Sequence, residues 1–249
     1  MIISKKILSV VIARAGSQGI KLKNVKPFFN IPLVNWSVMA SRDSDYIDLT
    51  VISSNCPYVK SATNNLIGND VKWIDRPNSM ATPISKNEDA LIHAYHYAKR
   101  HFKFDADIVI NLQPTSPIRC NRLIDRCIGD YAYWHLQSDY KADSLVTVSK
   151  HTPFFWKLKD RPEAIWDVRN RKMRQEYEHD GDLLAHDDGN LYLVEAEKLL
   201  ERNCRIGESP VLFLLDRLEA LQIDEEVDFQ LMETLLKLKG ITKPIDIPD

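Results

Sequence analysis

The chain has 249 residues, of which 44% are hydrophobic and 27% charged, and this composition suits one large domain with a buried core. The formal net charge of −2 excludes a globally basic surface, so we expect no nucleic acid partner. No apolar run approaches the roughly 20 residues that span a bilayer, and the four cysteines form no CxxC pair. Without a membrane span or a signal-peptide pattern, we expect a cytoplasmic protein with reduced thiols.

The first predicted element is a strand at Ile7–Ala13, where only Ser9 is polar, as in a strand buried on both faces of a parallel sheet. The loop that follows contains two glycines, which allow close backbone approach to a ligand, and Ser17, which can donate to a phosphate oxygen. Its cations are Arg14, Lys21 and Lys23. The loop fits neither GxxxxGK[ST] nor GxGxxG, so it is either a phosphate site of another kind or an ordinary solvated turn.

Strands then alternate with helices along the chain. We predict strands at 48–53, 71–74, 106–112, 144–149, 189–195 and 211–215, and helices at 32–42, 56–67, 87–102, 121–129, 196–203 and 226–239. The helix at 87–102 has the clearest pattern, with Asn87 as a candidate cap and acidic residues in its first turn. This alternation predicts a three-layer α/β/α fold with a mostly parallel, Rossmann-like sheet and ligand sites at the carboxyl ends of the strands.

The segment 150–186 breaks this pattern, with prolines, several aromatic residues and a charged run. It is either a long surface loop or an excursion from the sheet that buries its aromatic side chains against a partner subunit. We interpret the chain as a single domain, 1–249, with 150–186 as an inserted excursion for dimerisation and acceptor binding. A run of acids and histidines at 179–188 suits either a metal ion or a solvated acidic loop.

Several motifs resemble those of the CMP-acylneuraminate synthetase family, the sialic acid or nonulosonic acid cytidylyltransferases. The family's RxGSxG…KN occurs as RAGSQG at 14–19 with KN at 23–24, and its RPxxLA resembles RP at 76–77 with MA at 80–81. The most specific match is LQPTSPIR at 112–119, close to the family's LQPTSPLR, and RQ at 174–175 and ID at 223–224 follow in order. The resemblance covers nearly the full length.

The resemblance implies a nucleotidyltransferase fold and the transfer of CMP from CTP to the anomeric hydroxyl of a 2-keto-3-deoxy sugar acid, with release of pyrophosphate. It also implies Mg²⁺ as the cofactor, CTP and a small acidic sugar as the substrates, and a homodimer. By resemblance, Arg14 and Lys23 are the catalytic cations that stabilise the phosphate charge. The expected nucleotide-binding residues are Ala13, Arg14, Ala15, Gly16, Ser17, Gly19, Lys23, Asn24 and Arg76.

The same resemblance assigns the acceptor side and the metal. The expected acceptor-binding residues are Gln113, Ser116, Arg174 and Gln175, since an arginine fork can bond both oxygens of a carboxylate. Asp224 matches the second aspartate of the family's DID motif and is the expected metal ligand. Arg119 is either part of this site or a surface charge at the start of a helix.

Three departures from the family pattern leave alternatives open. Gln222 replaces the first aspartate of DID, Gln18 replaces the lysine of GSK, and Asp188 replaces the asparagine of the NG motif. A lost carboxylate lowers Mg²⁺ affinity unless other oxygens compensate, and a negative charge at 188 repels a carboxylate but suits an amino or hydroxyl group. The acceptor could therefore be a phosphonate or another 2-keto acid, or the protein could be a catalytically idle nucleotide-binding relative.

Overall fold

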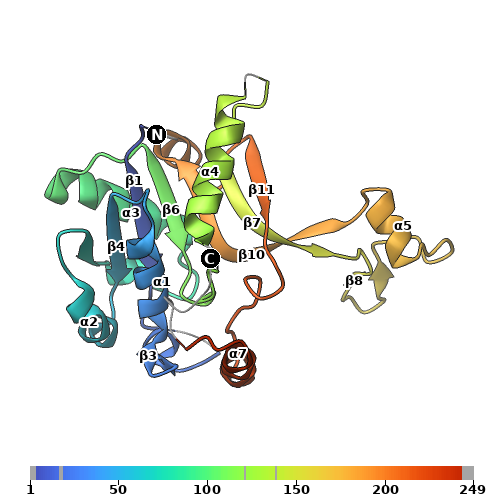
Figure 1. Cartoon of the computed structure of the whole chain (residues 1–249), viewed down its shortest axis with the longest axis horizontal. Coiled ribbons are helices and arrows are strands. Elements are labelled where there is room, and N and C mark those ends of the chain that lie inside the picture. Colours follow the sequence, from blue (N-terminus) through green and yellow to red (C-terminus); the bar gives the residue numbers. More distant parts are fainter. Residues whose placement is uncertain (1–3, 17–18, 121, 138, 243–249) are drawn as a thin grey trace.

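The computed structural model describes residues 4–16, 19–120, 122–137 and 139–242. Within these residues, seven strands form one central sheet (Figure 1). They are β1 (Ile7–Ile12), β4 (Leu49–Ser54), β5 (Val71–Asp75), β6 (Ile108–Leu112), β7 (Ser144–His151), β10 (Leu184–Glu195) and β11 (Pro210–Leu214). Their spatial order is β11-β7-β10-β6-β1-β4-β5, so the first predicted strand lies inside the sheet.

The sheet is mostly parallel. β1 pairs in parallel with β4 and β6, β4 pairs in parallel with β5, and β11 with β7. Only β10, of the strands in this sheet, runs antiparallel to both of its neighbours, β6 and β7. The carboxyl ends of β1, β4, β5 and β6 therefore meet at one edge, as the alternating pattern predicts.

Helices cover both faces of the sheet, which gives the predicted three layers. Side chains alternate along β1, so Ile7 and Val11 pack on one face while Leu8 and Val10 pack on the other. The helices on the first face are α1 (Leu33–Asp43), α2 (Pro57–Thr63) and α4 (Leu123–Leu136), and those on the second are α3 (Asn87–Tyr97) and α6 (Ala196–Arg202). The core lies in these two interfaces.

Shorter elements complete the body. A small hairpin of β2 (Pro27–Phe28) and β3 (Ile31–Pro32) packs with α1 and the closing helix α7 (Glu226–Leu238) in a third apolar cluster. Single 3₁₀ turns, η1 to η3, occur at Lys23–Val25, Asn64–Leu66 and Asn78–Met80, and a π-helical turn, η4 (Ala98–Phe102), extends α3. No helix of the described residues has both the length and the apolar character that crossing a membrane requires.

An arm projects from the sheet between β7 and β10 (Figure 1). It contains the two-residue strands β8 (Trp156–Lys157) and β9 (Glu163–Ala164) and the short helix α5 (Arg174–His179). Its small core is aromatic: the Phe154 ring lies 5.1 Å from that of Trp166 and 5.5 Å from that of Tyr177, and the Arg171 guanidinium stacks 4.3 Å over Phe154. The predicted excursion at 150–186 covers this arm together with the ends of the two strands that support it.

Three sequence expectations about elements need correction. Asn87 does not cap α3, because Lys86 occupies the N-cap position and no side chain bonds the free amides there. α4 continues seven residues beyond the predicted end at Gly129, since Tyr131 and Ala132 bury further apolar surface. β10 begins at Leu184, five residues before the predicted start, because its polar first half pairs with β7 at the base of the arm.

Candidate active site

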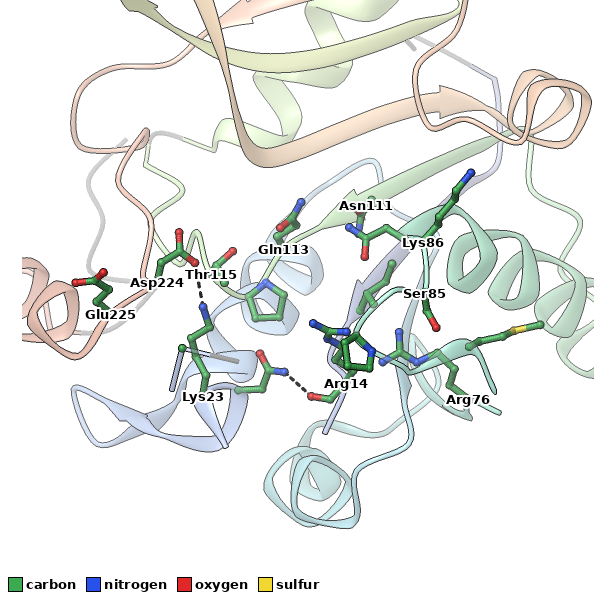
Figure 2. Close-up of a pocket in the computed structure, with 17 residues that line it drawn as sticks. Arg14, Lys23, Arg76, Ser85, Lys86, Asn111, Gln113, Thr115, Asp224 and Glu225 are labelled. Atoms are coloured by element: carbon green, nitrogen blue, oxygen red, sulfur yellow. Dashed lines mark hydrogen bonds and ion pairs between the residues drawn. The ribbon is translucent and has the colours of Figure 1, made fainter. Parts of the chain in front are cut away.

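A cavity of about 520 Å³ lies at the carboxyl ends of the parallel strands (Figure 2). Four loops contribute to it, following β1, β5 and β6 and preceding α7. Its charged and amide-bearing lining residues are Arg14, Lys23, Asn24, Arg76, Lys86, Asn87, Asn111, Gln113, Asp224 and Glu225. The lining is therefore rich in cations and hydrogen-bond donors, which suits a polyanionic ligand with polar groups.

The loop after β1 is held in place by its neighbours. The Ala13 amide donates to the Ser53 carbonyl at 3.1 Å, and the Ala15 amide donates to Oδ1 of Asn55 at 3.1 Å. The Asn24 side-chain amide donates to the Arg14 carbonyl at 3.1 Å. Two predicted nucleotide contacts, Asn24 and Ala15, thus fix the loop through these bonds, while the Arg14 side chain faces the cavity (Figure 2).

Arg76 follows β5 and is 5% exposed. Its Nε and Nη2 are buried and have no hydrogen-bond partner among the described residues. Burial, and then the nearby positive charge of Arg14, lower the pKa of Arg76 to about 10, so the side chain stays cationic at neutral pH. Figure 2 shows the two guanidinium groups close together on one wall of the cavity. A buried cation with unused donors, such as Arg76, is costly unless an anion joins it, whereas Arg14 is only half-buried and already donates to the Thr82 carbonyl.

Lys23 occupies another wall. Its Nζ donates to the Ile223 carbonyl at 2.8 Å and lies 3.0 Å from Oδ1 of Asp224 (Figure 2). Gly19 lies against the same segment, because a Cβ added there would lie 2.7 Å from the Asp224 carbonyl oxygen. The chain between β11 and α7 therefore closes over the loop after β1, and it brings the predicted metal ligand beside a predicted catalytic cation.

The loop after β6 forms the floor. Its Gln113 and Thr115 line the cavity, and the Thr115 carbonyl accepts from the Ile223 amide at 2.8 Å. Arg119 is 6% exposed and donates to Oγ of Ser37 and to the carbonyls of Gln113 and Asn190, each at 3.0 Å. Arg119 is therefore neither a surface charge nor a ligand contact, but an internal brace for this loop.

A second cavity of about 1150 Å³ lies at the base of the arm. Residues of β7, β10, the arm and the segment after β11 line it, and Asp224 lines both cavities. Its charged or titratable residues are Lys150, His151, Arg174, Glu178, His186, Asp188, Asp216, Arg217 and Asp224. Gln113 stands near the junction, since a Cβ added at Gly189, beside Asp188, would lie 3.2 Å from Nε2 of Gln113.

The structure divides the predicted site residues between these places. Arg14, Gly19, Lys23, Asn24, Arg76, Gln113 and Asp224 line the first cavity, and Arg174 lines the second. Ser116 lines neither: it is 1% exposed, with a buried hydroxyl that has no partner in the described part of the chain. Gln175 and Gly16 are exposed and line neither cavity. Ser17 and Gln18 lie outside the described residues.

Sequence reasoning missed several cavity residues. Asn111 is the only polar residue of β6; its Nδ2 donates to the Val10 carbonyl at 3.3 Å, and its buried Oδ1 has no partner in residues 4–16, 19–120, 122–137 and 139–242. A lone amide in a buried strand is a signal that the pattern already contained. Ser85 and Lys86 follow the 76–81 motif and carry no signal of their own, because only the loop's path brings them to the cavity.

The donor set suits Mg²⁺ at the rim of the first cavity. Mg²⁺ takes oxygen ligands and usually only one or two carboxylates, and Asp224 and Glu225 both line this cavity. The described residues contain no cluster of three or more histidine, cysteine or acidic side chains that could hold a metal ion. Gln222 has another role, because its side-chain amide donates to the Asp188 carbonyl. The residues present therefore fit an ion completed by phosphate oxygens and water, not a cage of protein ligands alone.

Comparisons with known proteins place this geometry among nucleotide-handling enzymes. The model of a family described as cytidylyltransferase matches residues 8–154, more than half of the chain. The chain is 22% identical over 240 residues to post-translational flagellin modification protein B of Campylobacter coli, covering 95% of this chain and 97% of that protein. It is also 22% identical over 247 residues to the CMP-N,N'-diacetyllegionaminic acid synthase of Campylobacter jejuni, covering 95% and 97%.

Further comparisons support the fold. The chain is 22% identical to the N-acylneuraminate cytidylyltransferase of Escherichia coli, covering 96% of this chain and 54% of that protein. A solved structure of CMP:2-keto-3-deoxy-manno-octonic acid synthetase complexed with CTP superposes with a TM-score of 0.64 at 16% identity, covering 94% of this chain and 99% of the other. A 4-diphosphocytidyl-2C-methyl-D-erythritol synthase from Anaerococcus prevotii gives 0.63 at 10% identity, covering 95% and 98%.

Proposed function

Because the chain belongs to the cytidylyltransferase family and is a CTP-dependent nucleotidyltransferase, we propose that it transfers CMP from CTP to the anomeric hydroxyl of a sialic-acid-like nonulosonic acid. Pyrophosphate is the second product. The CMP-N,N'-diacetyllegionaminic acid synthase and the N-acylneuraminate cytidylyltransferase match this chain over 95% and 96% of its length, and this supports the choice of acceptor class.

The observation that carries the proposal is the pairing of two cavities around Asp224. The first holds one buried cation with unused donors, Arg76, next to Arg14, and the second holds further cations at the base of the arm. A triphosphate suits the first, and an acidic sugar suits the second. A group that lines both cavities lies where two substrates must meet for a phosphoryl transfer.

The residues perform two tasks in this reaction. The anomeric oxygen forms a bond to the α-phosphorus of CTP while the bond from that phosphorus to the α–β bridging oxygen breaks, that oxygen leaves with pyrophosphate, and the hydroxyl proton passes to solvent. Negative charge builds up on the departing pyrophosphate, and Arg14, Arg76 and Lys23 stabilise it from fixed positions. Gln113, at the junction of the two cavities, orients the acceptor against the α-phosphate.

We propose that Asp224 and Glu225 hold Mg²⁺ together with phosphate oxygens. The ion would supply charge neutralisation between the phosphate groups. Nζ of Lys23 lies 3.0 Å from Oδ1 of Asp224 in an ion pair, so this lysine restrains the carboxylate at the cavity rim. We expect pyrophosphate release to stop on addition of EDTA and to return with excess Mg²⁺.

We also propose that the protein is a homodimer whose arm packs on its partner. The arm exposes several large apolar side chains, and packing them against a partner would remove apolar surface from water, which supports a covered state. Its exposed apolar residues are Phe155, Trp156, Leu158, Ile165, Val168 and Met173. Sedimentation should give twice the monomer mass for the wild type and a lower mass for Leu158→Asp, which places a charge where the side chain is 93% exposed. A monomeric wild type contradicts the proposal.

We place the reaction in the cytoplasm. Cys56, Cys120 and Cys127 are buried free thiols, and burial raises the pKa of Cys120 to about 12 and that of Cys127 above its usual range. Unpaired thiols suit a reducing compartment. Fractionation of the source cells should recover the protein with cytoplasmic enzymes.

The function is tested by incubating purified protein with CTP, Mg²⁺ and one acceptor at a time. The acceptors are N-acetylneuraminic acid, N,N'-diacetyllegionaminic acid, 2-keto-3-deoxy-manno-octonic acid and, as a different class, 2-aminoethylphosphonate. We expect pyrophosphate and a CMP-linked product by mass spectrometry with a nonulosonic acid, and neither without an acceptor. Product on the phosphonate alone would replace the proposed acceptor, and no product with any of the four would count heavily against the function.

A further inference from the structure

We propose that Asp188 selects an acceptor that carries a cationic nitrogen, an amine or amidine, on a nonulosonic acid scaffold. The inference rests on the proposed function and narrows it to a substrate class. Asp188 lines the second cavity and is 4% exposed, so its carboxylate lies in the wall of the space that the acceptor would occupy.

The local backbone presents this residue to the cavity. The pairing of β10 with β7 shifts register between Asp187 and Tyr192, as at a β-bulge, and Gly189 has a φ of +65°. A bulge can re-aim a side chain that regular strand geometry would direct elsewhere. Gln222 supports the turn, because its side-chain amide donates to the Asp188 carbonyl.

The two oxygens of Asp188 differ in their partners. Oδ1 accepts from Oγ of Ser149 at 3.0 Å and lies 3.0 Å from Nδ1 of His186. Oδ2 is buried and has no hydrogen-bond partner in the part of the chain that the structure describes. The neighbouring Asp187 is different, since its Oδ1 accepts from the Gly189 amide and the Tyr192 hydroxyl and so serves the turn itself.

A hydrogen-bond donor would stabilise the unpartnered carboxylate oxygen, and the negative charge of the carboxylate favours a cationic donor. No lysine or arginine of the described residues forms an ion pair with Asp188, whose only ion-pairing neighbour there is His186. A hydroxyl group of the acceptor could donate equally well to the neutral side-chain oxygen of an asparagine. A cationic nitrogen gains both a hydrogen bond and the compensation of a buried negative charge.

The remaining charges of the cavity leave room for both ends of such an acceptor. Lys150, Arg174 and Arg217 line the cavity and suit the acceptor's carboxylate, which Asp188 would repel. Of the other acids that line it, Glu178 and Asp216 are exposed, and Asp224 pairs with Lys23. Asp188 is thus the one buried acid among the described lining residues, and it fixes the orientation of a substrate that carries both signs of charge.

The experiment compares matched acceptors. Pyrophosphate release is measured with CTP, Mg²⁺ and N-acetylneuraminic acid, and then with its 4-amino-4-deoxy, 7-amino-7-deoxy and 9-amino-9-deoxy analogues, which differ by one cationic group. We expect kcat/KM for at least one amino analogue to exceed that for the parent by at least tenfold. Asp188→Asn, which keeps an oxygen for Ser149 and His186, should reduce this preference to within about threefold.

Glu178→Gln is the matched control, because it removes one negative charge from the same cavity at an exposed position. We expect it to retain the preference. Equal rates with the parent and all amino analogues would overturn the inference but leave the proposed function standing. An equal loss of the preference in Asp188→Asn and Glu178→Gln would have the same consequence. No pyrophosphate with any acceptor would overturn the function and the inference together. CTP binding by Asp188→Asn with unchanged Kd shows that the variant is folded.

Discussion

The two cavities differ in how the fold holds their charged groups. The first is lined by the loops after three buried parallel strands and the loop before α7, and bonds between loops, such as those from Asn24 and Ala15, fix them. The second is lined by an antiparallel strand, an arm with a small aromatic core and exposed cations such as Arg174. The nucleotide side is therefore preorganised, whereas the acceptor side depends in part on the arm, which has only a small core of its own.

The largest effect that this comparison predicts is on catalysis at the rigid side. Lys23→Ala removes a buried cation that bonds the Ile223 carbonyl and Asp224, so both the charge and the position of the Asp224 segment are lost. We expect kcat/KM for CTP to fall by about 10³-fold, the upper range for one fixed electrostatic group. Steady-state pyrophosphate release measures it. The exposed Lys21 is the control, and a comparable loss in Lys21→Ala would show that overall charge, not position, is responsible.

A substitution of Arg76 tests whether its unpartnered donors bind the nucleotide. Arg76→Gln should weaken CTP binding by roughly 10- to 100-fold, the value of a charge-assisted hydrogen bond, in calorimetry. The same variant should melt at a higher temperature without ligand, because burial already disfavours the cation, as its lowered pKa of about 10 indicates. A variant that binds CTP normally, or that is destabilised without ligand, would show that Arg76 is a structural residue.

The rigid side is also the side that sequence predicts well. Apolar runs such as Ile7–Ile12 and Ile108–Leu112 are buried on both faces, so periodicity finds them, and residues that follow them must reach the same edge. What this reasoning misses is contact between distant segments. The Ala15 amide donates to the side chain of Asn55, and Arg119 turns inward to three acceptors, because of loop paths that no local pattern encodes.

On the acceptor side, the sequence motifs predict which residues lie near the site but not whether their side chains face a cavity. Ser116 and Gln175 stand in the right motifs, but one is buried away from both cavities and the other faces solvent. The bulge at 187–192 and the earlier start of β10 arise from pairing with β7, a long-range event. The charge at Asp188 is visible in the sequence, but its unpartnered oxygen is visible only in the structure.

A smaller effect is expected from the exposed cation of the acceptor side. Arg174→Gln should raise the KM for the acceptor acid by about 10-fold, with CTP Kd unchanged, because the residue lines only the second cavity. The loss is modest since an exposed cation is screened by water. Initial rates at saturating CTP measure it, and Gln175→Ala, next to it and outside both cavities, should have no effect. A change in CTP affinity in Arg174→Gln would show that the two cavities act as one functional site.

The smallest effect on global stability is expected in the arm. Tyr177 is 7% exposed, and its ring lies 5.5 Å from that of Phe154 in the small core of the arm, so Tyr177→Ala should lower the free energy of unfolding by under about 1 kcal/mol. Leu112→Ala, in the central sheet, should cost about 2–5 kcal/mol. Urea melts and hydrogen exchange separate the two: faster exchange confined to the arm supports a locally stable unit, because opening there leaves the sheet intact. A global loss equal to that of Leu112→Ala would mean that the arm folds with the core, and the contrast between a rigid nucleotide side and a loosely held acceptor side would then be wrong.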